Sequence, residues 1–212
     1  PAVLAGCVVF GLRALLVVAV TTAACVFFEW GFEKLCHTPS TISDLSAAVT
    51  GVLLAMNLPV SIPLWQAVFG ALVAIVAVKG LFGGIGKNFA NPAITARIVM
   101  FLAFSKTMTA WVFPDAVSSA TPLAMMANGE PVDYLTLLLG NHGGCLGETS
   151  ALALLIGFAY LLIRGVISWH TPVCFVGTVF VMSLILGQDA VGQILSGGLM
   201  LGAIFMATDY ST

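Results

Sequence analysis

Charged residues are scarce in this sequence. They make up 8% of its 212 residues, whereas hydrophobic residues make up 60% and the mean hydropathy is +1.10. Soluble domains carry roughly a quarter charged residues, so this composition excludes an ordinary soluble domain and indicates an integral membrane protein. The net charge of −2 and the lack of a basic run argue against nucleic acid as a partner.

Metal-binding and nucleotide-binding patterns are also missing. No C-x-x-C pair and no histidine at ligand spacing occurs, so we expect no metal site within this chain. The five cysteines are scattered: Cys7, Cys25, Cys36, Cys145 and Cys174. GGIGKN (83–88) places glycines before a lysine as a P-loop does, but Leu81 stands where the first glycine is required. We therefore expect no nucleotide hydrolysis here.

Apolar segments recur along the whole chain. Breaks at proline, glycine and charged residues predict helices over 13–33, 43–58, 65–82, 92–104, 147–163, 172–187 and 191–207. Backbone polar groups inside a bilayer must be satisfied within helices, so the expected fold class is all-α, a polytopic transmembrane helix bundle. Several segments are shorter than the ~20 residues of a full span, which indicates broken or re-entrant helices.

The chain reads as one transmembrane domain over 1–212. It starts and stops close to apolar stretches, so we expect a fragment of a longer protein, and 1–10 lacks the basic start and cleavage site of a signal peptide. The longest polar connection is 105–146, whose only basic residue is Lys106. The positive-inside rule then places this connection outside the cell.

The other basic residues support the same orientation. If the seven helices alternate in direction, one set of loops is cytoplasmic, at 29–44, 79–91 and 164–171. That set contains most of the remaining basic residues: Lys34, Lys79, Lys87 and Arg164.

Two stretches suggest an internal repeat. DLSAAVTGVLLAM (44–56) and GETSALALLIGFA (147–159) each carry an acidic residue, one spacer and Ser-Ala before an apolar helix. Asp44 would open its helix from the cytoplasm and Glu148 from outside, as in an inverted repeat. Both carboxylates are expected to be helix caps, with an ion or proton relay as the alternative, and Asp209 is a third ion-coupling candidate.

The glycine turn at 83–88 leads into a helix with a clear start signal. Asn91 is expected to cap it, with Pro92 at the first helical position. Lys87 and Asn88 remain candidates for contact with an anionic ligand. Arg97 lies inside this helix, where a charge at the bilayer centre costs ~2.5–3.5 kcal/mol. It either snorkels to the cytoplasmic rim or serves a function.

Small hydroxyl residues gather at PDAVSSATPLAMM (114–126), inside the outer connection. Thr121 is expected to cap a short helix that begins at Pro122 and runs to Asn128. This explains Thr-Pro but not the preceding Ser118 and Ser119. Small neighbours leave a hydroxyl accessible to a modifying enzyme.

DAVSSATPL resembles the covalent flavin-attachment motif shared by the D subunit of the Rnf electron-transport complex and the B subunit of the sodium-translocating NADH:quinone oxidoreductase. The matching positions are Asp115, Ser118, Ala120 and Thr121, while Ser119 stands where glycine is commoner. Further stretches resemble family signatures in the expected order: DLSAAVTGVLLAMNLP (44–59), FGGIGKNFANPA (82–93), GETSALALLIG (147–157) and FMATD (205–209). The Ser-Ser-Ala-Thr-Pro form and the short loops favour the D subunit.

The resemblance implies FMN joined to Thr121 through a phosphoester, placed there by a flavin transferase. It also implies a second, noncovalent flavin such as riboflavin, with Asn88, Asn91 and Thr95 as candidate neighbours. The complex would move electrons between ferredoxin and NAD and couple this to Na⁺ or H⁺ movement across a bacterial or archaeal cytoplasmic membrane. Other membrane and peripheral subunits would carry the ferredoxin and NAD sites, because this chain has no Fe–S cysteine set and no dinucleotide fingerprint.

Two other classes of protein fit the helix pattern alone. A small-solute channel or transporter would use broken helices and inverted repeats around a polar site at the midplane. A structural membrane anchor would need no site at all. Both leave the Ser-Ser-Ala-Thr motif unexplained, and both predict a colourless protein.

Overall fold

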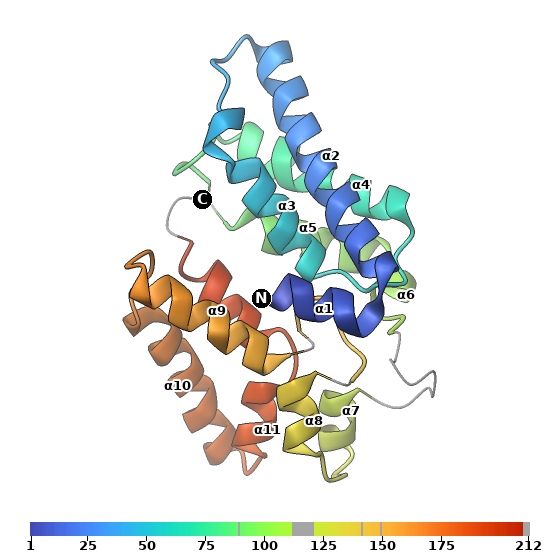
Figure 1. Cartoon of the computed structure of the whole chain (residues 1–212), viewed down its shortest axis with the longest axis vertical. Coiled ribbons are helices and arrows are strands. Elements are labelled where there is room, and N and C mark those ends of the chain that lie inside the picture. The colour runs from blue at the N-terminus through green and yellow to red at the C-terminus, as the bar shows by residue number, and fades with distance from the viewer. Residues whose placement is uncertain (89, 112–120, 141, 149, 210–212) are drawn as a thin grey trace. The chain divides into compact units, whose positions relative to one another are not determined.

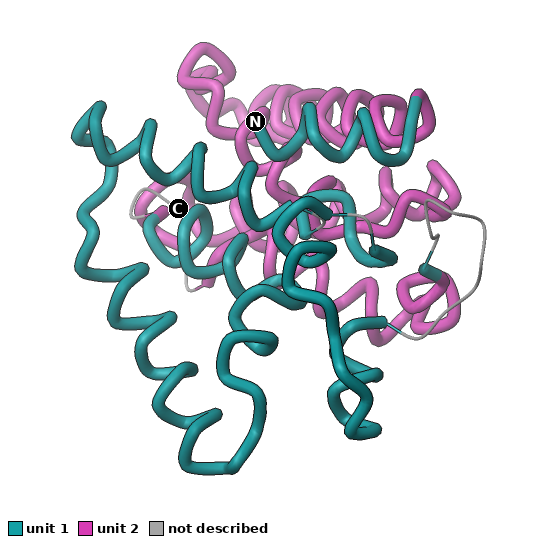
Figure 2. The backbone as a smooth tube through the Cα atoms, turned by 60° about the horizontal axis from the view of Figure 1, so that its bottom comes forward, with its two compact units in different colours: residues 1–11, 111–208 teal, residues 12–110, 209–212 magenta. Residues whose placement is uncertain are grey.

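The structure is a computed structural model that describes residues 1–88, 90–111, 121–140, 142–148 and 150–209. All regular elements in these ranges are helical and none is a strand, which confirms the expected all-α class. The chain divides into two compact units (Figure 2). Unit 2 comprises residues 12–110 and 209–212, and unit 1 comprises residues 1–11 and 111–208.

Unit 2 is organised around its first helix. Its elements are α2 (Leu12–Cys36), the 3₁₀ turn η1 (Ile42–Asp44), α3 (Ser46–Met56), α4 (Leu64–Leu72), the π-helical segment η2 (Val73–Gly80), α5 (Pro92–Ala103) and α6 (Ser105–Met108). α2 packs against α3, α4 and η2 (Figure 1). A Cβ on Gly51 would lie 2.7 Å from the Cα of Thr22, so only glycine permits this approach of α3 to α2.

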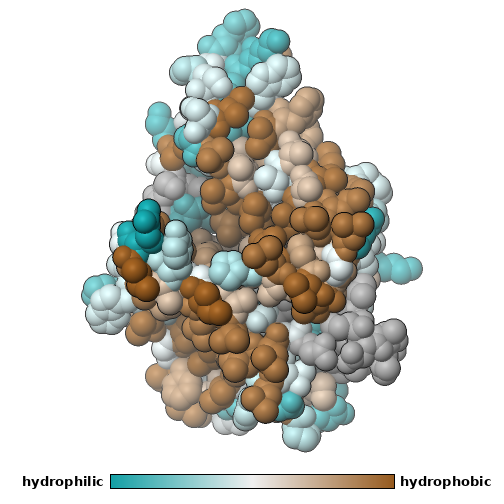
Figure 3. All heavy atoms as spheres, in the orientation of Figure 1, coloured by the Kyte–Doolittle hydropathy of each residue, from teal (hydrophilic) through white to brown (hydrophobic). Residues whose placement is uncertain are grey.

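α2 is the one helix in the described part of the chain that is long and apolar enough to cross a bilayer. It has 25 residues, and an 18-residue stretch of it has a mean hydropathy of 1.9. Five further apolar helices have 10–17 residues, shorter than a full span, as the sequence predicts. Apolar side chains cover much of the visible surface, and hydrophilic ones gather where α2 leads into η1 (Figure 3).

Unit 1 is built from shorter pieces. Its elements are α1 (Ala2–Phe10), α7 (Pro122–Ala127), α8 (Tyr134–Leu139), α9 (Ala151–Ile163), α10 (His170–Ile185), α11 (Ala190–Leu195), α12 (Leu199–Leu201) and the π-helical segment η3 (Gly202–Met206). α10 packs against α11 and η3, and α9 contacts α8, α12 and α1.

Two predicted helices differ from those observed in unit 1. The helix expected over 191–207 is interrupted at Ser196–Gly198, where Gly197 adopts a φ of +70° that favours glycine. The helix expected over 147–163 begins only at Ala151. The preceding stretch, 142–147, is a buried loop with three glycines rather than a first helical turn.

Candidate functional site

Thr121 stands at the start of α7, as the sequence predicts. Its backbone is extended, Pro122 occupies the first helical position, and its Oγ1 accepts a hydrogen bond from the N–H of Ala124 at 3.4 Å. This exceeds the usual 2.7–3.2 Å range, so the cap holds the hydroxyl weakly. Thr121 is half-buried. The other motif residues, Asp115, Ser118, Ser119 and Ala120, lie outside the described residues.

Unit 1 brings Glu148 and a residue of the helix that Thr121 begins close to the same glycine. A Cβ on Gly197 would lie 3.0 Å from Cδ1 of Leu123, two residues after Thr121, and 3.8 Å from Oε1 of Glu148. Met126 of the same helix packs on Gly192 of α11. The helix that Thr121 begins and the Glu148 carboxylate therefore flank one loop.

The cap of α9 is Ser150 rather than the expected Glu148. The Ser150 Oγ accepts from the N–H of Ala153 at 3.2 Å and donates to the carbonyl of Leu138 at 3.3 Å. Helix starts favour serine because its short side chain reaches the free N–H groups of the first turn. Glu148 is thus left available for another role.

The glycine turn of unit 2 forms as predicted, and Asn91 caps α5. Its Oδ1 accepts from the N–H groups of Ala93 at 3.0 Å and Ile94 at 3.2 Å, and Thr95 Oγ1 donates to the Asn91 carbonyl at 3.0 Å. Asn91 and Thr95 therefore have structural partners. Lys87 is exposed.

Asn88 differs from its neighbours in this turn. Both polar atoms of its side-chain amide are buried, and neither has a hydrogen-bond partner among the residues that the structure describes. A buried amide without partners costs free energy, so this side chain has unused capacity to bind a polar ligand.

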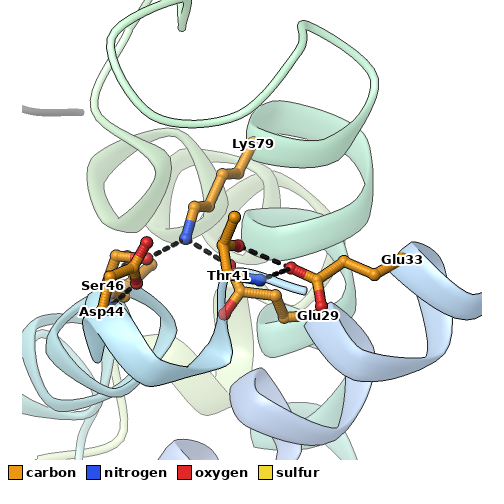
Figure 4. A network of polar contacts seen from close by, with 7 residues as sticks. Glu29, Glu33, Thr41, Asp44, Ser46 and Lys79 are labelled. Atoms are coloured by element: carbon orange, nitrogen blue, oxygen red, sulfur yellow. Dashed lines mark hydrogen bonds and ion pairs between the residues drawn. The ribbon is translucent and has the colours of Figure 1, made fainter. Parts of the chain in front are cut away.

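A buried ion pair joins α2 to η2 in unit 2, and the sequence pattern did not predict it. Lys79 Nζ pairs with Glu29 Oε1 and also donates to Ser46 Oγ (Figure 4). Lys79 is 3% exposed and Glu29 is 5% exposed. The prediction that Lys79 lies in a cytoplasmic loop is wrong, because the π-helical segment η2 carries it into the core.

A second carboxylate lies one turn further along α2. Glu33 is 8% exposed, and its Oε1 accepts hydrogen bonds from the N–H of Thr41, at 2.8 Å, and from its hydroxyl (Figure 4). The Oε2 atoms of both Glu29 and Glu33 are buried without a partner among the described residues. The cluster therefore contains two buried carboxyl groups and one amino group.

A cavity of about 470 Å³ opens beside this cluster. Its lining includes Glu29, Glu33, Lys79 and Lys87. Two glutamates at i and i+4 of an apolar helix were the available sequence signal, because buried carboxylates are rarely left unpaired.

Asp44 lies at the edge of the same network. Its Oδ1 accepts from the N–H of Ser46, the first residue of α3, at 2.8 Å. The cap position itself is occupied by Leu45, so Asp44 lies one residue before the expected cap. Partial desolvation raises the pKa of the Asp44 carboxyl. Hydrogen bonds from Ser46 and the positive charge of Lys79 outweigh this effect and leave the pKa below its ordinary value.

Arg97 and Asp209 complete the predicted candidates. Arg97 Nη1 donates to Oδ1 of Asn57 at 2.8 Å, so this charge is held by the residue that follows α3 rather than reaching freely to the rim. Asp209 follows η3 and is half-buried.

The whole chain, residues 1–212, matches the model of the NQR2, RnfD, RnfE family. It is 46% identical over 220 residues to the D subunit of the Na(+)-translocating ferredoxin:NAD(+) oxidoreductase complex of Acetobacterium woodii, covering 100% of this chain and 69% of that protein. It is 36% identical over 235 residues to the D subunit of the proton-translocating ferredoxin:NAD(+) oxidoreductase complex of Clostridium ljungdahlii, covering 100% and 71%. It is 37% identical over 182 residues to the B subunit of the Na(+)-translocating NADH-quinone reductase of Azotobacter vinelandii, covering 76% and 45%.

Proposed function

Because the chain belongs to the NQR2, RnfD, RnfE family, we propose that it is a membrane-embedded electron-transfer subunit carrying covalent FMN on Thr121. It would act within an ion-translocating ferredoxin:NAD oxidoreductase complex, as the names of its D-subunit relatives suggest. Catalysis would require the partner subunits, and a flavin transferase would load the flavin.

The observation that carries this proposal is the condition of the Thr121 hydroxyl. Thr121 is half-buried and follows a run of small residues, and the hydrogen bond that its hydroxyl accepts from the N–H of Ala124 spans 3.4 Å. Forming the phosphoester keeps the Thr121 oxygen and replaces its proton with phosphorus, and a weakly bonded oxygen can do this without loss of a strong internal hydrogen bond. When bound, FMN would accept and release electrons, and the protein would set its position and surroundings.

The test is covalent flavin on the purified subunit, coexpressed with its flavin transferase. We expect ultraviolet fluorescence that survives denaturation and an FMN-sized mass increment on the peptide spanning 115–123. Thr121→Ala should lose both signals, whereas Thr109→Ala, which removes an exposed hydroxyl elsewhere, should keep them. A dark wild-type band with an unmodified peptide would overturn the proposal and favour the solute-transporter alternative.

A second, noncovalent flavin such as riboflavin is proposed near Asn88, whose amide is buried without a partner among the described residues. Asn91 and Thr95 would hold the turn in shape through their own hydrogen bonds. Asn88→Ala should lower the flavin released by acid while leaving the covalent flavin unchanged. Equal release from both proteins would remove Asn88 from the site.

Ion coupling is proposed to involve the buried charges of unit 2. Lys79 pairs with Glu29, whereas the Glu33 carboxylate is bonded to Thr41, and a buried carboxylate without a counter-charge is costly unless a cation or proton balances it. A change of charge at a flavin could bias this balance. Asp44 would join through Ser46, while Glu148 and Asp209 remain candidates. The choice between Na⁺ and H⁺ calls for transport measurements.

The remaining proposals concern the membrane. We propose a multi-pass bundle with an inverted repeat in the cytoplasmic membrane, with the Thr121 segment facing outward. Each unit contains one Ser-Ala motif leading into a helix, α3 or α9, and one π-helical segment, η2 or η3. With Lys79 buried, the charge bias now rests on Lys34, Lys87 and Arg164. Labelling single cysteines placed at 130 and 165 from each side of the membrane would test this orientation.

A further inference from the structure

The Glu148 side chain lies between two glycines, Gly144 and Gly197, whose missing Cβ atoms leave room for it. A Cβ on Gly144 would lie 3.3 Å from Cδ and Oε1 of Glu148, and a Cβ on Gly197 would lie 3.8 Å from Oε1. The side chain is half-buried and does not cap α9, which Ser150 does. The carboxylate is therefore held between two backbone surfaces without serving the helix start.

The same loop contains a buried hydroxyl with spare capacity. Ser196 directly precedes Gly197, is 2% exposed, and its Oγ has no hydrogen-bond partner in the described part of unit 1. A buried hydroxyl without a partner costs free energy. This cost is removed if a polar ligand atom meets it.

The helix that Thr121 begins lies against this loop. Leu123 Cδ1 would lie 3.0 Å from a Cβ on Gly197, the point that Glu148 Oε1 also approaches. Met126 packs on Gly192, one turn before Ser196. Leu123 thus holds α7 against Gly197 and Met126 holds it against α11, so the helix that carries Thr121 at its start lies beside the loop that Glu148 and Ser196 share.

We propose that Glu148 and Ser196 form the protein side of the flavin site next to Thr121, Glu148 as a fixed negative charge that lowers the reduction potential and Ser196 as a hydrogen-bond partner. This inference rests on the proposed covalent FMN. Reduction adds negative charge to the flavin, and a nearby carboxylate in a partly desolvated site opposes that addition.

The test is spectroelectrochemical titration of the flavin in the loaded, purified subunit. Glu148→Gln removes the charge at nearly constant volume, and we expect the midpoint potential to rise by about 30 mV, a tenfold change in the equilibrium of a two-electron couple. Glu148→Asp keeps the charge and should stay near the wild type. Glu130→Gln makes the same change at an exposed position of the same unit and should have no effect.

Two further variants keep the proposal testable if Glu148→Gln does not fold. Gly144→Ala should push the carboxylate by a few tenths of an ångström and shift the potential by less than Glu148→Gln does. Ser196→Ala should also shift it, whereas Ser183→Ala, at a similarly buried position in α10, should not. Equal potentials in all loaded variants would overturn this inference alone. A wild type without covalent flavin would overturn the proposed function and this inference with it.

Discussion

Polar side chains are buried in both units, but their chemistry differs. All the buried charged residues in the described part of the chain belong to unit 2: Glu29, Glu33 and Lys79. The buried polar residues of unit 1 are hydroxyls and one imidazole: His142, Ser150, Ser183, Ser196 and Thr208. The contrast holds although the two units have similar lengths and share the Ser-Ala motif.

Buried charges and buried hydroxyls have different effects on the free energy of unfolding. A buried ion pair with an extra carboxylate is costly to desolvate, and a well-packed apolar cluster would often be as stable or more stable. The buried charges of unit 2 therefore lower its stability, as expected of residues kept for the proposed cation coupling. Burying a hydroxyl costs far less free energy than burying a charge. Hydroxyls also offer hydrogen bonds without the electric field of a net charge, which suits the surroundings of a cofactor.

Loss of the Lys79 ammonium should give the largest effect on stability. Lys79→Met leaves the Glu29 carboxylate buried without its cation, and breaking a buried pair in this way costs about 3–5 kcal/mol. The measurement is the free energy of unfolding in detergent, followed by tryptophan fluorescence. Lys106→Met, at an exposed position, should change it little.

The double variant Glu29→Gln/Lys79→Met distinguishes the contribution of the ion pair from the cost of leaving one charge unpaired. It removes both charges, so its loss should be clearly smaller than that of Lys79→Met. If the double variant is at least as unstable as the single one, the pair is not what distinguishes the core of unit 2.

Close helix packing should also differ between the units. Gly51→Ala in unit 2 places a Cβ 2.7 Å from the backbone Cα of Thr22, and such overpacking costs about 1–3 kcal/mol. Gly157→Ala in unit 1 meets only the far end of the Phe205 ring, at 2.8 Å, which can turn aside. The higher helix propensity of alanine, about 1 kcal/mol, should bring that variant near neutrality.

Unfolding curves of the two variants check this order. Gly31→Ala is the control, because a Cβ there meets nothing within 4 Å. It should be neutral or slightly stabilising. A Gly157→Ala variant less stable than Gly51→Ala would show that unit 1 has the tighter packing.

Local signals made part of this architecture predictable. Asn-Pro and Thr-Pro mark helix starts through the cap and the missing N–H of proline, and both α5 and α7 begin as expected. The break at Ser196–Gly198 was not predicted, because its flanking residues continue the apolar pattern. π-helical segments leave no periodic signal that differs from an α-helix over so few residues.

The buried ion pair could not be predicted from the sequence, because its two residues are far apart along the chain. Glu29 and Lys79 are 50 residues apart, and neither residue type predicts a partner at that separation. Lys79 precedes a glycine and a polar turn, so it resembled a loop residue. Two glutamates one turn apart on the apolar α2 were a usable warning, since neither could be buried without a partner. For Thr121, the local pattern predicted only a helix cap, whereas the resemblance of its motif to a known family predicted flavin attachment.

Helix caps should give smaller and more equal effects in the two units. Ser150→Ala removes the cap of α9 and Asn91→Ala the cap of α5, and each should cost about 1 kcal/mol. Thermal unfolding compares them, with Ser40→Ala at an exposed position as the neutral control. Equal losses would show that the contrast between the units lies in buried charge and not in their helix starts.

The smallest expected effect is a pH dependence at the surface of unit 1. Asp133 caps α8, and hydrogen bonds from the Thr136 hydroxyl, at 2.6 Å, and from the N–H of Leu135, at 3.2 Å, hold its pKa below the ordinary value. Its contribution is therefore complete above the unfolded pKa, about 3.9, and is lost as the pH falls through the lower folded pKa. Stability curves from pH 6 to about 3 should converge for the wild type and Asp133→Asn. Asp44→Asn in unit 2 should show the same pH dependence, because the pKa of Asp44 is also lowered. If only one of the two variants shows it, the units differ in their exposed carboxylates as well as in their buried charges.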